Sequence, residues 1–151
     1  RPQQYPESYA TRYRAMAAKF REVKGIQRED RIGRGWWRLQ GLKLFGAPTV
    51  IYICIDRLFY FQDAGINVWP IFDCGLVAQN IMLLALEYGL GTIPQAQSVL
   101  YPNILRRVLN LSESKLIVLG ITIGYPDWND AINQFQSERE SLDRIIQWYG
   151  F

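Results

Sequence analysis

The feature that most restricts the fold is a long segment, about Trp69 to Tyr88, that is apolar almost all the way round a helix. An ordinary surface helix carries one apolar stripe, whereas a helix that is apolar on every side is predicted to be buried on every side. Gly89 supplies the stop expected at its end. Burial on every side is unusual for so long a helix in a single domain of 151 residues. Either it lies at the centre of the fold, or a partner subunit covers one of its faces.

Polar residues interrupt this segment, so that it falls short of the ~18 uninterrupted apolar residues of a membrane span. They are Asp73, Gln79 and Asn80. Buried amides need hydrogen-bond partners, and we expect Gln79 and Asn80 to find them between helices across a dimer rather than on a ligand. Because no signal-peptide pattern opens the chain either, the sequence predicts a soluble, cytoplasmic protein without a membrane-spanning segment.

Two runs of β-branched and apolar residues, Thr49 to Asp56 and Leu116 to Tyr125, predict central strands, the first covered on both faces. Residues 91–97 form a short strand or a loop. Two strands are few for a sheet, so either the partner donates one or part of the sheet lies outside this chain. The remaining predicted elements are helices over about 8–24 (capped by Ser8), 28–44, 103–109 and from 142 onwards (capped by Ser141), and an extended polar arm over 126–140. Strands that alternate with helices predict an α/β layered domain.

The most useful absence in the composition is histidine: the chain has none, and only two cysteines. This excludes Ser-His-Asp and Cys-His catalysis and any histidine-based zinc site. Two cysteines cannot complete a four-ligand zinc site alone. Cys54 and Cys74 both lie in apolar runs and are predicted to be buried free thiols in a reducing compartment. An enzyme built on this chain is therefore expected to take its chemistry from an organic cofactor and not from a metal.

The net charge of +3 is too small to predict nucleic-acid binding. Basic residues are nevertheless concentrated in the first 45 residues, where Arg31, Arg34 and Arg38 share one predicted helix face. Such a face is either simply solvated or attracts anionic ligands such as phosphorylated cofactors.

The order of several segments resembles one protein family, the flavin-dependent nitroreductases. The segments are FGAPTVIYICIDR, DCGLVAQNIMLLALEYGLGTIPQ, KLIVLGITIGYPDW and NQFQSERESLDRIIQWYGF. They contain the Ala-Pro before a strand, the Gln-Asn helix, the Gly-Leu-Gly-Thr turn, the Ile-Gly-Tyr-Pro strand end, and an asparagine and arginine that are here Asn133 and Arg139. No single motif is specific, but their order is, and it covers nearly the whole chain. The resemblance implies a nitroreductase-like α+β sandwich, with a central sheet flanked by helices, in an intertwined homodimer.

Members of this family normally begin with a further portion that carries an arginine-rich phosphate motif and a Pro-Ser-x-x-Asn-x-Gln-Pro-Trp loop against the flavin. Neither motif occurs in residues 1–151. The resemblance therefore implies that the chain is one nitroreductase-like domain, 1–151, that corresponds to the C-terminal two-thirds and lacks its N-terminal portion. A fragment, a processed chain and a truncated relative all remain open. We expect this chain alone to bind FMN weakly.

The resemblance implies an FMN site made of two parts. Arg139 is placed to bind the phosphate, because a guanidinium stays charged and can bind phosphate oxygens bidentately; the alternative is a surface ion pair with Glu138 or Glu140. Ser137 lies where relatives can have a second cationic contact, and offers a hydroxyl. The second part, implied to lie beside the flavin ring with a backbone N–H towards its N5/O4 edge, is Pro94, Gln95, Ala96 and Gln97. The alternative for this segment is an ordinary proline-containing loop.

The implied activity is electron transfer from NAD(P)H to a nitroaromatic, a quinone or a similar electrophile, in two half-reactions at one flavin face. No side chain is implied to be catalytic. Four aromatic residues could roof the ring or stack on a substrate, although packing in the core is the better interpretation for each: Trp36, Trp37, Trp69 and Phe72. The alternative function is a non-catalytic dimeric subunit or binding module that retains the fold without a complete flavin site.

Overall fold

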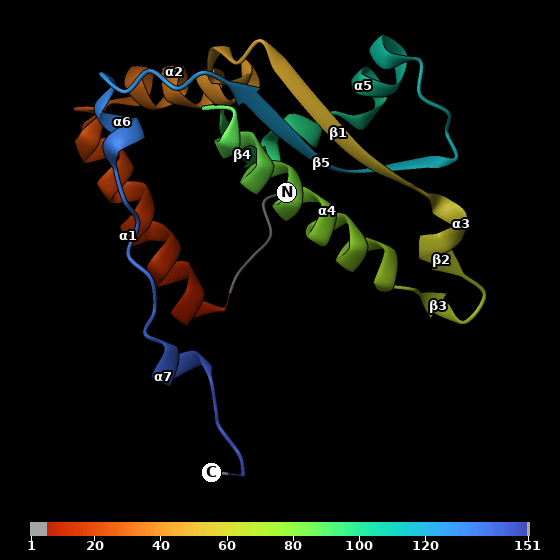
Figure 1. Ribbon diagram of the computed structural model, residues 1–151. Coiled ribbons are helices and arrows are strands. Elements are labelled where there is room, and N and C mark those ends of the chain that lie inside the picture. Colours follow the sequence, from red (N-terminus) through yellow and green to blue (C-terminus); the bar gives the residue numbers. More distant parts are fainter. Residues whose placement is uncertain (1–5, 151) are drawn as a thin grey trace. The chain divides into compact units, whose positions relative to one another are not determined.

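The computed structural model describes residues 6–150, which divide into two compact units (Figure 1). The larger unit spans residues 34–126. The smaller combines the residues up to Gly33 with those from Asp127 onwards. Helix α2 (Arg31–Leu42) crosses the boundary between the two units.

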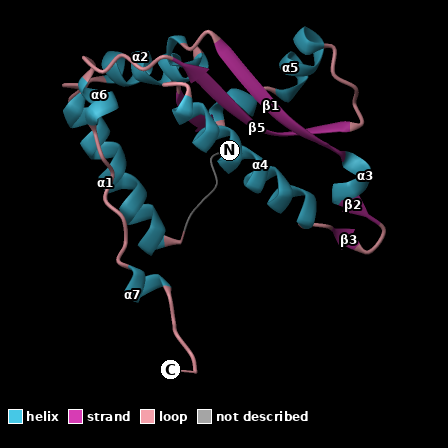
Figure 2. Cartoon of the chain, viewed as in Figure 1, coloured by secondary structure: helices cyan, strands magenta, loops and turns pink. Residues whose placement is uncertain are grey.

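The larger unit contains the sheet and most of the helices (Figure 2). After α2 its elements are η1 (Leu44–Gly46), β1 (Thr49–Asp56), α3 (Arg57–Tyr60), β2 (Phe61–Gln62), β3 (Gly65–Ile66), α4 (Trp69–Glu87), β4 (Gly91–Gln95), η2 (Gln97–Val99), α5 (Pro102–Leu109) and β5 (Lys115–Gly124). Strands β1, β5 and β4 form an antiparallel sheet in that order, and β2 and β3 form a small hairpin. The predicted combination of a central sheet with helices is confirmed.

The two long strands differ in their positions. Strand β5 is central, as predicted, and contains the most deeply buried residues, Ile121 and Thr122. Strand β1 was expected to be central and covered on both faces, and this is wrong within the chain, because it forms one edge of the sheet and is only half-buried. An apolar, β-branched run does not distinguish an edge from a centre. Strand β4 forms the other edge, where Pro94 is tolerated although it has no N–H to donate.

Helix α4 forms as predicted and ends at a glycine. Gly89 adopts a φ of +68°, and the N–H of Leu90 donates to the carbonyl of Ala85 at 3.0 Å, which closes a Schellman motif. The interpretation that α4 lies at the centre of this chain's own fold is wrong. Only one stripe of small side chains is buried: Cys74, Ala78 and Ala85.

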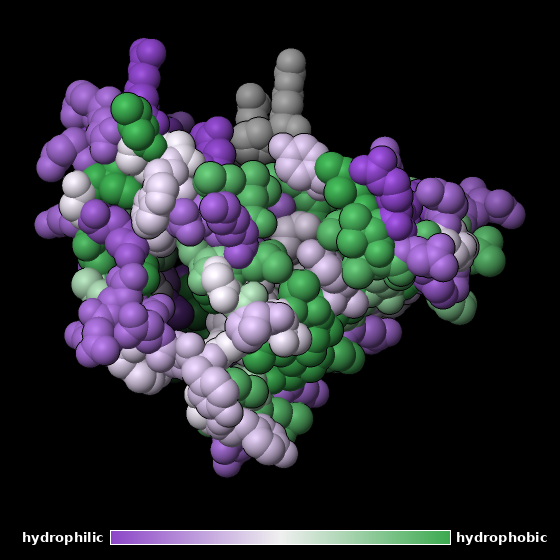
Figure 3. All heavy atoms as spheres, turned by 90° about the horizontal axis from the view of Figure 1, so that it is seen from above, coloured by the Kyte–Doolittle hydropathy of each residue, from purple (hydrophilic) through white to green (hydrophobic). Residues whose placement is uncertain are grey.

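Most of the large apolar side chains of α4 are exposed within the chain, and so are Gln79 and Asn80, whose predicted partners lie across a dimer. The exposed apolar residues of the helix include Phe72, Leu76, Val77, Leu83, Leu84 and Leu86. Broad hydrophobic areas are visible on the molecular surface (Figure 3). An apolar surface of this extent marks an interaction site.

By length and composition alone α4 is apolar enough to cross a membrane, with a mean hydropathy of 1.4. A helix at a protein interface meets the same criterion. Its polar side chains favour the interface, because an exposed carboxylate or amide is costly in lipid, and α4 exposes Asp73, Gln79 and Asn80.

The smaller unit consists of α1 (Glu7–Val23), α6 (Ala131–Gln134), α7 (Leu142–Ile145) and their connections. Helix α1 begins after Pro6, so the predicted cap at Ser8 is wrong, because Ser8 already lies inside the first turn. The predicted stop at Gly25 is confirmed by a φ of +65° and by a bond from the N–H of Ile26 to the carbonyl of Arg21 at 2.8 Å.

The arm over 126–140 is not wholly extended, because it contains the short helix α6. The side chain of Asp130 caps α6 by accepting from the N–H of Ile132 at 3.1 Å, a local hydrogen bond that favours a helix start. Ser141 stands at the N-cap position of α7 but makes no side-chain cap bond, and α7 is a single short turn rather than the longer amphipathic helix that was predicted.

Candidate functional site

The arm from Asp130 to Glu140 runs along α1 (Figure 1). The two are antiparallel, and charged pairs join them. As the residue numbers rise along α1, those of their partners on the arm fall. The contacts are Arg12 with Glu140 (2.8 Å), Lys19 with Glu138, the ring of Phe20 with that of Phe135 (centroids 5.0 Å apart), and Lys24 with Asp130 (2.6 Å). The order of these contacts fixes the register of the arm on the helix.

A pocket of about 400 Å³ lies between α1 and the arm. Its lining carries more basic than acidic side chains, and the aromatic ring of Phe135 and the small or apolar residues of α1 complete it. The lining residues are Arg12, Ala15, Met16, Lys19, Phe135, Glu138, Arg139, Glu140 and Arg144. The excess of positive charge suits an anionic ligand.

Arg139 is an exposed member of this lining, and among residues 6–150 its guanidinium bonds only to its own loop. Its Nη1 donates to the carbonyls of Ser137 and Glu138, at 3.1 and 3.2 Å. Within residues 6–150 no carboxylate lies at ion-pair distance from it, because Glu138 pairs with Lys19, and Glu140 pairs with Arg12 and Arg144. The surface ion pair that was the alternative for Arg139 is therefore not formed.

Ser137 and Arg139, the two predicted phosphate contacts, bond to each other. The hydroxyl of Ser137 accepts a hydrogen bond from Nη1 of Arg139. Asn133, the other residue of the family's pair, donates from Nδ2 to the carbonyl of Asp127 at 2.8 Å and stabilises the loop. The arrangement leaves Nε and Nη2 of Arg139 without a hydrogen bond to any other described residue, and so able to bind an anion.

The carboxylates that pair with α1 have lowered pKa values. A hydrogen bond from Lys19 and its charge lower the pKa of Glu138. A hydrogen bond from Arg144, aided by the charges of Arg144 and Arg12, lowers the pKa of Glu140. The pKa of Asp130 falls because of a hydrogen bond from Lys24 and one from the N–H of Ile132. These carboxylates are therefore ionised at neutral pH.

Acid is expected to release the arm from α1. A folded-state pKa below the unfolded value contributes stability above the unfolded pKa, and that stability is lost as pH falls through the folded pKa. The arm should thus be held at neutral pH and released below about pH 4, the ordinary range of these groups. Pepsin cleavage within residues 130–144, followed by mass spectrometry, would measure this release, with cleavage in α4 as the control. Equal protection of the arm at pH 5 and pH 3 would contradict the prediction.

The second predicted part of the site lies in the larger unit, at the end of the edge strand β4. Pro94 and Gln95 are the last residues of the strand, Ala96 follows it, and Gln97 begins η2. The turn is held firmly, because the hydroxyl of Ser98 donates to the carbonyl of Gln95 at 2.8 Å. The segment is therefore a fixed strand end rather than an ordinary loop.

Ala96 and Gln95 both carry polar groups without a partner. Ala96 is exposed, and its backbone N–H donates to no acceptor among residues 6–150. The side chain of Gln95 is only 5% exposed, and neither its Nε2 nor its Oε1 has a hydrogen-bond partner within the described chain. An unpaired buried amide costs about 1–3 kcal/mol and is closed to solvent, so the group of this segment that is open to a ligand with polar edge atoms is the backbone N–H of Ala96.

Gln97 anchors this segment to α2. Its Nε2 donates to the carbonyl of Arg38 at 2.9 Å. Gly41 makes the contact possible, since a Cβ at that position would lie 2.3 Å from Oε1 of Gln97. The side chain of Gln97 is thus used within the fold, and only its backbone is left for a ligand.

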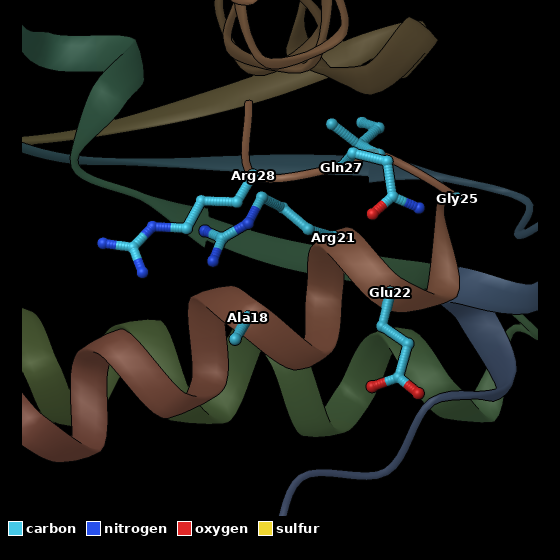
Figure 4. A pocket seen from close by; sticks show the side chains of 7 residues that line it. Ala18, Arg21, Glu22, Gly25, Gln27 and Arg28 are labelled. Carbon is cyan, nitrogen blue, oxygen red and sulfur yellow. The ribbon is translucent and has the colours of Figure 1, made fainter. Parts of the chain in front are cut away.

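A second pocket, also of about 400 Å³, lies at the C-terminal end of α1. Its lining residues are Ala18, Arg21, Glu22, Gly25, Ile26, Gln27 and Arg28. Arg21 and Arg28 extend to one side of the helix and Glu22 to the other (Figure 4). The helix dipole stabilises a cation at this end, which accounts for Arg21 without a ligand, and Arg28 is an exposed surface residue.

The remaining predicted residues lie outside these sites. Cys54 and Cys74 are free thiols; Cys74 is buried as predicted, whereas Cys54 is half-buried, and burial raises the pKa of each. The four aromatic residues do not form a core, because three of them are more than half exposed: Trp36, Trp69 and Phe72. Within residues 6–150 no cluster of metal-ligating side chains occurs.

Sequence reasoning missed the residues of α1 that hold the arm. Arg12 and Lys19 were grouped only with a general basic surface. The signal was weak, because Lys19 and Glu138 are separated by 119 positions and nothing local links them. Complementary charge in the two segments, basic at one end of the chain and acidic around Arg139, was the one available indication.

Relatives with known structures share the fold described above. A solved structure of the FMN and NADPH-dependent nitroreductase NfnB from Sphigopyxis sp. strain HMH matches all of this chain and 65% of its own, with a TM-score of 0.89 and 27% identity. The structure of NfnB from Mycobacterium smegmatis, in complex with NADPH, matches with a TM-score of 0.85 and 23% identity, which supports the fold alone.

Curated relatives give the same assignment from sequence. The chain is 32% identical to chloronitrobenzene nitroreductase of Comamonas testosteroni over 95% of its length and 60% of the relative's. It is 30% identical to 4-nitrobenzoate reductase of Pseudomonas putida, over 97% of its length and 63% of the relative's. The chain thus spans about three-fifths of the length of these relatives. A sequence profile of the nitroreductase family matches residues 5–125, and the chain belongs to this family.

Proposed function

We propose that this chain is part of an FMN-dependent oxidoreductase that passes electrons from NAD(P)H to a nitroaromatic, a quinone or a similar electrophile. The observation that carries the proposal is Arg139, a guanidinium without a carboxylate partner among the described residues, in a pocket of positive charge. Such a group can bind two oxygens of a phosphate monoester at once. The descriptions of the Sphigopyxis relative as FMN- and NADPH-dependent, and of two relatives as reductases of nitroaromatic compounds, support the same chemistry.

Each of the two units, taken by itself, carries residues that fit one part of FMN. Arg139 and the hydroxyl of Ser137 would hold the phosphate. In the larger unit, the exposed backbone N–H of Ala96, which has no acceptor among residues 6–150, would meet the polar edge of a flavin ring. FMN, when bound, supplies the electron and hydride chemistry that no side chain of this chain provides.

The protein's own contribution is binding, orientation and electrostatic stabilisation. A backbone N–H fixed at the end of β4 can stabilise negative charge at an atom in front of it without reorganising. Pro94 helps to fix this donor, because its ring restricts the backbone of the strand end. Since the chain contains no histidine, we assign no catalytic role to a side chain.

The partners that we propose are a second copy of the chain and a small electrophile, in the cytoplasm, without nucleic acid or membrane. Exposed apolar residues on α4 support the second copy. Two free thiols support a reducing compartment.

FMN titration of the purified protein, together with NAD(P)H oxidation in the presence of a nitroaromatic acceptor, tests the proposal. We expect FMN to bind, to colour the protein yellow, and to be required for turnover. A protein that binds no FMN and oxidises no NAD(P)H would contradict it and would favour a non-catalytic subunit.

The affinity for FMN is expected to depend on chain length. The curated relatives extend beyond the matched region, and the family's phosphate motif and flavin loop are not found in residues 1–151. This chain alone should bind FMN weakly, and the same chain joined to the upstream segment of a relative should bind it tightly. Fluorescence titration of FMN against both proteins measures the difference. Equal affinities would mean that the upstream segment takes no part in the site.

A further inference from the structure

We infer that α1 positions the phosphate-binding arginine: Lys19 and Arg12 hold the two glutamates that flank Arg139 and leave its guanidinium free for an anion. The inference rests on the proposed function, because it concerns the FMN phosphate. It assigns a role in cofactor binding to two residues that lie more than a hundred positions from Arg139 in the sequence.

Arg139 lies between two glutamates that are both held by ion pairs to α1. Nζ of Lys19 bonds to Oε1 of Glu138, and Nη2 of Arg12 lies 2.8 Å from Oε2 of Glu140. These glutamates are the immediate neighbours of Arg139 in the sequence. Arg12 and Lys19 lie two turns apart on one face of α1, which separates them by about 10.5 Å along the helix axis. The two glutamates lie ~7 Å apart along an extended arm, and the long side chains of the four residues bridge the difference.

The charges explain why Arg139 remains unpaired. Without α1, the carboxylates of Glu138 and Glu140 would compete for the guanidinium beside them and would repel a phosphate dianion. The cations of α1 neutralise both carboxylates, and Arg144 adds a second bond to Glu140 at 2.8 Å. A phosphate that approaches this loop therefore meets the positive charge of Arg139, because the negative charges of Glu138 and Glu140 are neutralised.

Two further contacts hold the preceding part of the arm in the same register. Lys24, whose side chain is only 16% exposed, donates to both carboxylate oxygens of Asp130 at 2.8 and 2.6 Å. The rings of Phe20 and Phe135 meet edge to face, an arrangement that stabilises aromatic pairs. The arm is thus attached to α1 on the N-terminal side of Arg139 as well.

The test compares two flavins in the protein that binds them. Riboflavin has the ring of FMN but no phosphate, so a defect in positioning Arg139 should weaken FMN binding and leave riboflavin binding unchanged. For Lys19→Glu and Arg12→Glu we expect the dissociation constant of FMN to rise about three- to tenfold each, as exposed charges contribute modestly. The double variant Lys19→Glu with Glu138→Lys, which restores the pair with its charges exchanged, should regain most of the lost affinity.

Arg14→Glu is the matched control. Arg14 also lies on α1 and is exposed, but it pairs with Glu7 of the same helix and not with the arm. It changes the net charge by the same amount and should leave the ratio of the two affinities unaltered. An equal loss in Arg14→Glu, an equal loss of FMN and riboflavin binding in Lys19→Glu, or the absence of rescue in the exchanged pair would each overturn the inference.

The same titrations separate this inference from the proposed function. If Arg139→Ala weakens FMN binding while Lys19→Glu and Arg12→Glu do not, the phosphate site stands and the role of α1 is wrong. If Arg139→Ala leaves FMN binding unchanged, the phosphate site itself is wrong. Selective loss of FMN binding in all three variants supports both.

Discussion

Replacing Arg139 with alanine is expected to weaken FMN binding about ten- to a hundredfold. Hydrogen bonds to charged groups contribute about 1.5–3 kcal/mol, and each 1.4 kcal/mol changes an affinity about tenfold. The side chain is exposed and bonds only to its own loop, so its removal opens no cavity and should leave the fold intact. Fluorescence titration with FMN measures the affinity, and circular dichroism checks the fold.

The lysine variant and a second arginine make this experiment specific. Arg139→Lys should recover only part of the affinity, because an ammonium group lacks the planar fork that binds two phosphate oxygens. Arg28→Ala removes an exposed arginine that likewise has no ion-pair partner among the described residues, but that lines the other pocket. It should have no effect on FMN. Excess FMN should restore activity to Arg139→Ala if the defect lies in retaining the cofactor. An unchanged FMN affinity in Arg139→Ala would return this residue to the role of a surface charge.

Local sequence signals predicted the helices well because their physics is local. The φ values at Gly25 and Gly89 are the left-handed ones that end a helix, and glycine adopts them without strain. The same reasoning failed at Ser8, because the helix starts two residues earlier with Pro6 at the N-cap position. A serine that could cap a helix does not prevent the helix from beginning at a nearby residue.

Long-range relations could not be predicted from the residues alone. The apolar run of β1 indicates a strand but not its place in the sheet, which depends on the pairing of β5 with both β1 and β4. The Lys19 and Glu138 pair likewise depends on the path of the arm. The family's order of motifs singled out Arg139, Ser137 and the segment from Pro94 to Gln97, whereas the buried amide of Gln95 without a described partner could not be predicted, since it depends on tertiary packing.

The protein is expected to be a homodimer whose interface includes α4 from Phe72 to Leu86. The helix packs its small residues against the sheet and exposes its large apolar ones. Obligate homodimer interfaces have this apolar, core-like composition. An obligate interface of this kind buries more than about 2,000 Å² in total. Light scattering should therefore find a dimer at micromolar concentration, and a stable, soluble monomer would contradict the prediction.

A single charge placed in this surface should separate the subunits. Leu84 is 62% exposed in the chain, so Leu84→Asp is compatible with the fold of one subunit. In the dimer the carboxylate would be buried without a partner, which costs about 3–5 kcal/mol and should weaken association at least about a hundredfold. Val108→Asp, at a residue of α5 that is 72% exposed, makes the same kind of change outside the proposed interface and should leave the dimer intact. Sedimentation or light scattering across a dilution series measures both variants. If the two variants dissociate at the same concentration as the unaltered protein, the exposed face of α4 is covered by something other than a second copy.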